Sequence, residues 1–263
     1  NNGEYEDWVE LYNPTIAAID ISGWFLTDKP ANPTKWLIPS SFIVPANGVV
    51  LIYCSGRDEI SGGNAHSNFK ITQTKGNEVL MLTNAANAFQ DSIRVLPNQQ
   101  SHTRGRQTNG ATIWSVFTTG TPNASNTGAM QEYATTPVFS QVGGYNSAAV
   151  NLTLTSPDPN ITIYYTTNGD EPNNTSTVYA VPINIATTTV VKAIAYSSTT
   201  NIPPSFIDYH TFFFGLDIHT IPILSISGDG IDDLMVSIPF GTTALPNSRP
   251  AGTIEYFDEN GIL

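Results

Sequence analysis

The chain has little cysteine and little charge. Among its 263 residues there is one cysteine, Cys54, so it cannot form an internal disulfide, a thiolate zinc cluster or a CxxC redox pair. Only 12% of the residues are charged, about half the usual share of a globular domain. The fold must therefore be held by apolar cores. Cys54 lies in phase with Val50 and Ile52 in an apolar run, which predicts a buried, inert thiol.

Basic residues are scarce as well. Ten Lys and Arg face 22 Asp and Glu, which gives a net charge of -12 and disfavours binding to nucleic acid or to anionic lipid. The nearest approach to a basic patch, Arg104-Gly105-Arg106, is predicted to be a solvated loop. There is also no apolar run long enough to cross a bilayer, so this chain is predicted to contain no membrane span.

The common catalytic patterns are missing too. There is no HExxH pair, no GxSxG elbow and no glycine-rich phosphate loop, and no thiolate sits beside a basic residue. The four histidines are widely separated: His66, His102, His210 and His219. Two carboxylates facing each other across a cleft would be a relation in space that the sequence does not show. We therefore predict no catalytic residue and no enzyme activity in this chain.

What the sequence does contain is a series of strand signals. Apolar and polar residues alternate over 150–155 and again over 161–166, which places one face of each strand in a core. The only short helix candidate is 231–235. A passage rich in Thr, Gly, Asn and Pro at 118–137 predicts a boundary, and a second boundary is expected near 216–222. The fold class is therefore predicted to be all-β, with more than one domain.

The first half resembles the lamin-tail type of immunoglobulin-like domain. The resemblance is carried by EDWVELYNP (6–14), DISGWFLTD (20–28), KWLIP (35–39), GVVLI (48–52), GNEVL (76–80) and TPNASN (121–126). It implies a β-sandwich used for attachment over residues 1–128, with its first strand upstream of Asn1. The positions that the family fills with core aromatics are taken by four tryptophans: Trp8, Trp24, Trp36 and Trp114.

Residues 136–215 resemble the small β-sandwich at the C-terminus of chitobiase and β-hexosaminidase-like proteins. The matching segments are PVF (137–139), IYYTTNGDEP (163–172) and VKAIAY (191–196). The family signature is a Tyr-Thr-x-Asp-Gly hairpin that ends in Pro, and here Asn168 replaces the Asp. Because Asn-Gly also adopts positive φ angles readily, we expect a tight hairpin at Asn168 and Gly169.

The last segment, 216–263, resembles the start of spore-coat proteins of the CotH type, which are kinase-like. IPILSIS (221–227) and RPAGTIEYFDENG (249–261) carry this resemblance. It implies that the chain is a fragment, with an incomplete C-terminal β segment and with any catalytic part beyond Leu263.

The sharpest binding prediction concerns carbohydrate. Tyr164 and Tyr165 are adjacent on a predicted strand, so one ring must point outward, where it would stack on a sugar while Asn168 and Asp170 bond its hydroxyls. The alternative is that Tyr164 packs on a neighbouring strand or domain.

Two acidic groups are the places to look for calcium, although neither has the spacing of an EF-hand. One comprises Glu4, Glu6, Asp7 and Glu10 with Asp20 and Asp28, and the other is Asp229 with Asp232 and Asp233. An ordinary strand with a solvated face and an ordinary turn are the favoured interpretations, so no cofactor is predicted.

Together these features predict a non-catalytic β-sandwich portion of a larger exported bacterial surface protein. It would act as an attachment or spacer module, outside the cell or on its surface, with polysaccharide or cell-wall glycan as its partner. Two alternatives stay open. One is the N-terminal flank of a CotH-type atypical kinase, and the other is a carbohydrate-binding accessory module of a glycosidase.

Overall fold

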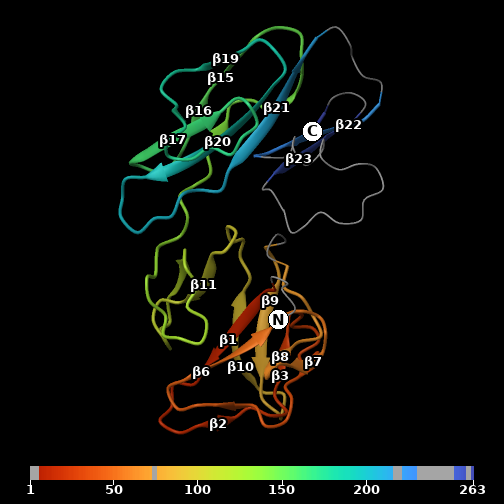
Figure 1. Ribbon diagram of the computed structural model, residues 1–263, viewed down its shortest axis with the longest axis vertical. Helices are drawn as coiled ribbons and strands as arrows, with labels where there is room; N and C mark the ends of the chain where they lie inside the picture. The colour runs from red at the N-terminus through yellow and green to blue at the C-terminus, as the bar shows by residue number, and fades with distance from the viewer. Residues whose placement is uncertain (1–5, 73–75, 216–220, 230–251, 259–261) are drawn as a thin grey trace. The chain divides into compact units, whose positions relative to one another are not determined.

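The computed structural model describes residues 6–72, 76–215, 221–229, 252–258 and 262–263. Strands make up all the regular structure in these ranges, so the predicted all-β class is confirmed (Figure 1). None of these residues forms a helix that could span a bilayer. The predicted short helix at 231–235 lies outside the described residues. Contacts divide the chain into two compact units, 1–130 and 131–263.

The first unit contains two four-stranded sheets and two short strand pairs. One sheet has the order β1 (Trp8–Tyr12), β6 (Val49–Tyr53), β8 (Asn64–His66) and β7 (Glu59–Ser61). The other has the order β10 (Phe89–Arg94), β9 (Val79–Thr83), β3 (Phe25–Thr27) and β4 (Trp36–Leu37). The pairs are β2 (Ile19–Asp20) with β5 (Ile43–Val44), and β11 (Thr103–Arg106) with β12 (Trp114–Phe117). All neighbours are antiparallel except β6 and β8.

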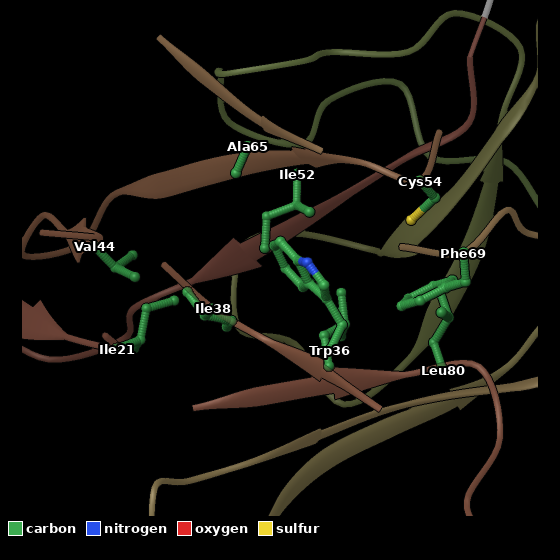
Figure 2. Close-up of a cluster of buried hydrophobic side chains, with 10 residues drawn as sticks. Ile21, Trp36, Ile38, Val44, Ile52, Cys54, Ala65, Phe69 and Leu80 are labelled. Atoms are coloured by element: carbon green, nitrogen blue, oxygen red, sulfur yellow. The ribbon is translucent and has the colours of Figure 1, made fainter. Parts of the chain in front are cut away.

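The core of this unit draws side chains from both four-stranded sheets, as the alternation of residues predicts. Trp36 is the largest of them, and it lies among Ile38, Ile52 and Phe69 (Figure 2). Cys54 belongs to the same cluster and is 1% exposed, so the predicted buried thiol is confirmed. Its burial raises the pKa of the thiol to about 12. Cys54 is thus a core side chain and not a nucleophile.

Two sequence predictions for the first unit need correction. Of the four tryptophans only Trp36 is buried, whereas Trp8, Trp24 and Trp114 are half-buried. Residues 104–106 are not a loop but part of β11, which pairs with β12. The reason is local: the Arg106 guanidinium lies 4.6 Å from the centre of the Trp114 ring and pairs with Asp91, so an arginine is held on a strand by a cation-π contact and a carboxylate.

The second unit is built on a five-stranded sheet. Its order is β14 (Gly144–Asn146), β21 (Asp208–Phe214), β20 (Thr189–Ser197), β17 (Ile161–Thr166) and β18 (Thr177–Val178). Only β14 and β21 are parallel. Two pairs complete the sandwich: β13 (Val138–Phe139) with β16 (Leu154–Thr155), and β15 (Val150–Leu152) with β19 (Ile183–Ile185).

Alternate residues of the five-stranded sheet form the second core. Ile163, Val191 and Phe212 meet Leu152 and Leu154 from the two strand pairs. The sheet edge requires a glycine just before β14, because a Cβ at position 143 would lie 2.5 Å from the backbone oxygen of Thr211. The alternation predicted for 150–155 and 161–166 is therefore confirmed.

A third strand pair, β22 (Ile223–Ser227) with β23 (Thr253–Phe257), packs on the face of β21 that points away from this core. In Figure 1 the pair lies beside β21. The Phe257 ring meets the Phe213 ring edge-on at 5.0 Å between centroids. The Thr211 hydroxyl bonds both the Ser225 hydroxyl, at 2.7 Å, and the Glu255 carboxylate. Sequence alone assigned these strands to a region of their own, whereas the contacts place them in the second unit.

Candidate functional site

The site begins with two adjacent tyrosines on β17 that the strand sends to opposite faces. Tyr165 follows Ile163 onto the second core and lies edge-on to the Tyr179 ring at 6.4 Å. Tyr164 points to the outer face, where its ring meets Tyr196 of β20 edge-on at 5.4 Å. Both side chains are half-buried, with Tyr164 on the outer face and Tyr165 against the core.

The outer face around Tyr164 is partly exposed, although Ile194, which is paired with Tyr164 on β20, is 7% exposed. Tyr164 and Tyr196 are both half-buried, and Val178, paired with Tyr164 on the edge strand β18, is 51% exposed. Tyr164 therefore does pack on a neighbouring strand, through its contact with Tyr196, while part of its ring stays exposed. An aromatic pair with exposed area can contact the apolar face of a sugar ring.

The polar part of the site is the loop that follows β17. Asn168 and Asp170 are exposed and bonded to each other: the Asn168 amide donates to the Asp170 carboxylate, and the Asp170 amide donates to Asn168 Oδ1 at 3.2 Å. The Thr166 hydroxyl donates to the Asp170 carbonyl at 2.6 Å. The loop thus offers amide and carboxylate groups in a fixed arrangement at the end of the strand that carries Tyr164.

The tight hairpin predicted at Asn168 and Gly169 is wrong. Only Gly169 has a positive φ, +85°, while Asn168 forms a parallel bridge with Val190, and the chain returns to pair with β17 only at Thr177. Asn168 is occupied with the neighbouring strand, so it is not free to take the left-handed conformation of a two-residue turn. The result is a β17–β18 hairpin with a ten-residue loop, 167–176, in place of a two-residue turn.

A buried lysine lies beneath this loop. Lys192 of β20 is 0% exposed, and its ammonium donates to the Ser227 carbonyl at 3.2 Å. Burial lowers the pKa of Lys192, while the carboxylates of Glu171, Asp229, Asp170 and Glu255 act in the opposite direction. Lys192 is thus a buried positive charge at the place where the sheet meets the acidic loop.

The carboxylates considered for calcium do not come together in the described residues. No three His, Cys, Asp or Glu side chains there are close enough to share a metal ion. The Glu10 carboxylate accepts a hydrogen bond from the backbone amide of Asn123. Burial raises the pKa of Glu10, and this hydrogen bond offsets part of the rise. The remaining pairs are Asp20 with the Ser22 amide, Asp28 with Lys35 and Glu6 with Arg57. Glu4, Asp232 and Asp233 lie outside the described residues.

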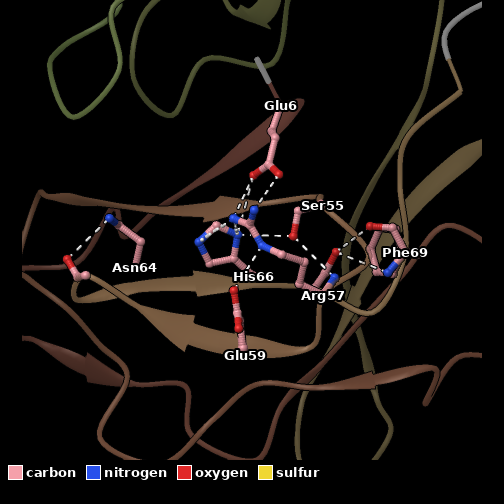
Figure 3. Close-up of polar contacts among 9 residues, drawn as sticks. Glu6, Ser55, Arg57, Glu59, Asn64, His66 and Phe69 are labelled. Carbon is pink, nitrogen blue, oxygen red and sulfur yellow. Dashed lines mark hydrogen bonds and ion pairs between the residues drawn. The ribbon is translucent and has the colours of Figure 1, made fainter. Parts of the chain in front are cut away.

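The first unit holds a polar cluster that the sequence did not reveal (Figure 3). Arg57 binds Glu6 through two contacts, Nη1–Oε1 at 3.0 Å and Nη2–Oε2 at 3.1 Å, and reaches Glu59 at 3.0 Å. Its Nη2 also lies 2.8 Å from His66 Nδ1. The His66 ring stacks on Tyr53 at 5.1 Å between centroids. Glu6 is 51 residues from Arg57, and no short motif marks such a pair.

This cluster contains a serine, a histidine and a carboxylate, but its geometry does not suit catalysis. Ser55 Oγ lies 3.1 Å from His66 Nδ1, and Glu6 Oε2 lies 3.5 Å from the same nitrogen. A catalytic triad needs the nucleophile and the acid on opposite ring nitrogens. Ser55 and His66 are also 4% and 1% exposed, so no substrate reaches them. The cluster ties the segment before β1 to the β7–β8 region.

Comparison with known families supports both sandwiches. The family model described as Lamin Tail Domain matches residues 1–96, and that described as Chitobiase/beta-hexosaminidase C-terminal domain matches residues 141–205. Both are immunoglobulin-like, non-catalytic modules, and both resemblances seen in the sequence are confirmed over these spans. Searches of curated proteins and of solved structures gave no match. The CotH-type resemblance of 216–263 finds no support in these comparisons and stays a prediction.

Proposed function

We propose that this chain is the non-catalytic, two-module portion of an exported bacterial surface protein, in which the second module binds polysaccharide and the first attaches or spaces it. Two successive immunoglobulin-like modules, matched to non-catalytic families, support a passive role. The low charge and the high content of Thr, Asn and Ser suit an extracellular surface. Cell-wall glycan is the partner that follows from this location.

The observation that carries the proposal is the outer face of β17 and β20. Tyr164 and Tyr196 form a half-buried aromatic pair there, and Asn168 lies two residues beyond the end of β17, bonded to Asp170. A hexopyranose presents one apolar face of C–H groups and a rim of hydroxyls, which suits an aromatic surface beside exposed amide and carboxylate groups. This face lies within the residues matched to the chitobiase-type family. We therefore choose chitin as the first ligand to test.

Tyr165 takes a supporting role in this proposal. It contributes to the core beneath the face, so truncating it would remove packing as well as any contact with sugar. The informative substitutions are Tyr164→Ala and Tyr196→Ala, which remove exposed ring area from the outer face.

The test is sedimentation of the full chain with insoluble chitin, cellulose and bacterial peptidoglycan. We expect binding to chitin or peptidoglycan, with at least about a tenfold weaker affinity in Tyr164→Ala, the size of effect for one stacked ring. Tyr256→Ala is the matched control, because Tyr256 is a 57% exposed tyrosine on β23 of the same unit. Equal losses in both variants, or no binding by the native chain, would reject the carbohydrate site and leave a spacer.

Two further interpretations belong to other classes of function. A CotH-type kinase flank and an accessory module of a glycosidase would each use the same two sandwiches to position a neighbouring catalytic domain. The coding sequence around this chain distinguishes them: kinase-type Lys and Asp motifs favour the first, and a glycosidase domain favours the second.

A further inference from the structure

The loop that carries Asn168 and Asp170 is held by a segment far along the chain. The Glu171 amide donates to Asp229 Oδ1 at 2.8 Å, across 58 residues of sequence. Just before Asp229, the Ser227 carbonyl accepts the Lys192 ammonium at 3.2 Å. Gly169 is also closely packed, since a Cβ at that position would lie 3.1 Å from Ser227 Cβ. Residues 227–229, at the end of β22, therefore contact the loop at Gly169 and at Glu171.

The segment 227–229 is itself fixed to the five-stranded sheet. Ser227 Oγ and Thr253 Oγ1 lie 2.8 Å apart and close the strand pair at this end. Farther along β22 and β23, Ser225 and Glu255 bond Thr211 of β21, and Phe257 packs on Phe213. A displacement of the strand pair would thus remove the acceptor that holds Glu171.

Lys192 completes the arrangement from inside the sheet. Its ammonium interacts electrostatically with the carboxylates of Glu171, Asp229 and Asp170. An ammonium attracts nearby carboxylates, so it opposes the repulsion between the two acidic side chains of the loop and Asp229 beside it. Lys192 and Asp229 therefore act on the same loop, one through charge and one through a hydrogen bond.

We infer that Asp229 and Lys192 are positioning residues for residues 168–171 of the loop, and that the end of β22 holds this loop in place without itself forming the binding face. The consequence for glycan binding rests on the proposed function. The conformation of the loop does not, because it is measured on the free protein.

The experiment compares Asp229→Ala with Asp229→Asn, which keeps an oxygen acceptor at the same place. Hydrogen exchange of the Glu171 amide is measured by NMR without ligand. We expect exchange about tenfold faster in Asp229→Ala, as for one lost hydrogen bond, and near-native exchange in Asp229→Asn. The amides of β17 and β20 serve as the control for global unfolding, and they should not change.

Lys192→Met is the second variant, because it keeps most of the side-chain volume and removes the charge. Faster exchange at Glu171 with unchanged exchange in β17 is expected there as well. Native exchange at Glu171 in both Asp229→Ala and Lys192→Met would overturn the inference.

Chitin binding is then measured on the same variants. If the native chain binds, Asp229→Ala should bind more weakly and Asp229→Asn should bind as the native chain does, and equal binding by all three would overturn the link to the site. If the native chain does not bind, the proposed function fails, while the exchange data still decide whether Asp229 and Lys192 position the loop.

Discussion

The two units are closed by different chemistry. The first contains several ion pairs, of which Arg57 with Glu6 joins distant segments; the others are Arg57 with Glu59, Lys35 with Asp28, and Arg106 with Asp91. In the described part of the second, the contacts that hold β22 and β23 are hydroxyl, carbonyl and ring contacts, together with one buried ammonium. His210 and Glu255, whose atoms Nδ1 and Oε1 lie 3.6 Å apart, form an ion pair only when the imidazole is protonated.

This difference shows how a chain with few charges places them. Arg57 is 25% exposed and Glu6 is 12% exposed, so their pair is partly shielded from salt and is worth more than a surface pair. The second unit instead places a buried ammonium, that of Lys192, beneath a loop that carries acidic side chains. Unit-specific perturbations can therefore separate the two modes of closure, because all four tryptophans lie in the first unit and report on it alone.

The largest effect should come from Trp36→Ala. Trp36 is 3% exposed, and its Nε1 donates to Asp58 at 2.9 Å, so truncation leaves both a cavity and an unpaired carboxylate oxygen. We expect the free energy of unfolding of the first unit to fall by about 4 kcal/mol. Urea denaturation followed by fluorescence of the other three tryptophans measures this. A loss below about 1 kcal/mol would mean that Trp36 is not central to the core.

The second largest effect should come from Arg57→Ala. It leaves the Glu6 carboxylate partly buried without its guanidinium, and it removes the contact to His66. Breaking such a pair costs about 3 kcal/mol in the first unit. Arg57→Lys should recover only part of this, because an ammonium does not make the two parallel contacts to Glu6. Circular dichroism of unit 131–263, prepared alone, is the baseline for the second unit in the full chain. If Arg57→Ala is as stable as the native protein in urea, then Arg57 does not stabilise the first unit by joining the segment before β1 to the β7–β8 region.

The change in stability per pH unit at alkaline pH is expected to be smaller than either of these losses, and Cys54 in the first unit and Lys192 in the second contribute to it with opposite signs. Burial raises the pKa of Cys54 from 9.0 to about 12, so the folded first unit keeps a proton that the unfolded chain releases. The stability that Cys54 contributes in this way is fully present below pH 9, and it falls by about 1.4 kcal/mol per pH unit between 9 and 12. Tryptophan fluorescence in urea at several pH values measures the slope. Cys54→Ala should abolish this part of the slope, and an unchanged slope in that variant would contradict the assignment.

In the second unit, Lys192 makes the free energy of unfolding depend on pH with the opposite sign. Its folded pKa is lowered by burial, so the cost of holding the charge is relieved as pH rises toward its ordinary value of 10.5. Tyr209 works against this, because burial raises its pKa and its contribution is lost above its ordinary value of 10.0. The difference between native protein and Lys192→Met isolates the lysine. A native second unit that gains no stability over Lys192→Met as pH rises to 10.5 would contradict it.

Local sequence patterns predicted many of the strands and core positions, but not β11 at 103–106 or the half-burial of three of the four tryptophans. The alternation around Ile163 and the apolar run that ends at Cys54 each predicted which side chains are buried, because period two fixes the two faces of a strand. The same rule showed that only one of Tyr164 and Tyr165 points outward. It did not show which one, because that choice depends on the side of the sheet that Leu152 and Leu154 cover.

Long-range contacts were beyond the reach of those patterns. The pairing of Asn168 with Val190 converts an expected two-residue turn into a longer loop, and turn propensity carries no information about that bridge. The Glu6–Arg57 pair and the Glu171–Asp229 hydrogen bond each join residues more than 50 positions apart. Such contacts follow from the assembled sheets, so the parts of the site that position it appear only in the structure.

The strand pair β22–β23 has an unusual distribution of side chains, with consequences for the order of folding. The side turned to β21 carries Thr253, Ser225 and Glu255, while the apolar Leu224 and Ile254 are 61% and 62% exposed. Phe257 is the one fully buried apolar side chain that the pair places against β21, where it packs on Phe213. Ser227 and Thr253, which close the pair, are also 26 residues apart, so the pair bears the entropy of a long closure. It should accordingly form after the five-stranded sheet has assembled, and it should open first under native conditions, as a separate cooperative element of the second unit.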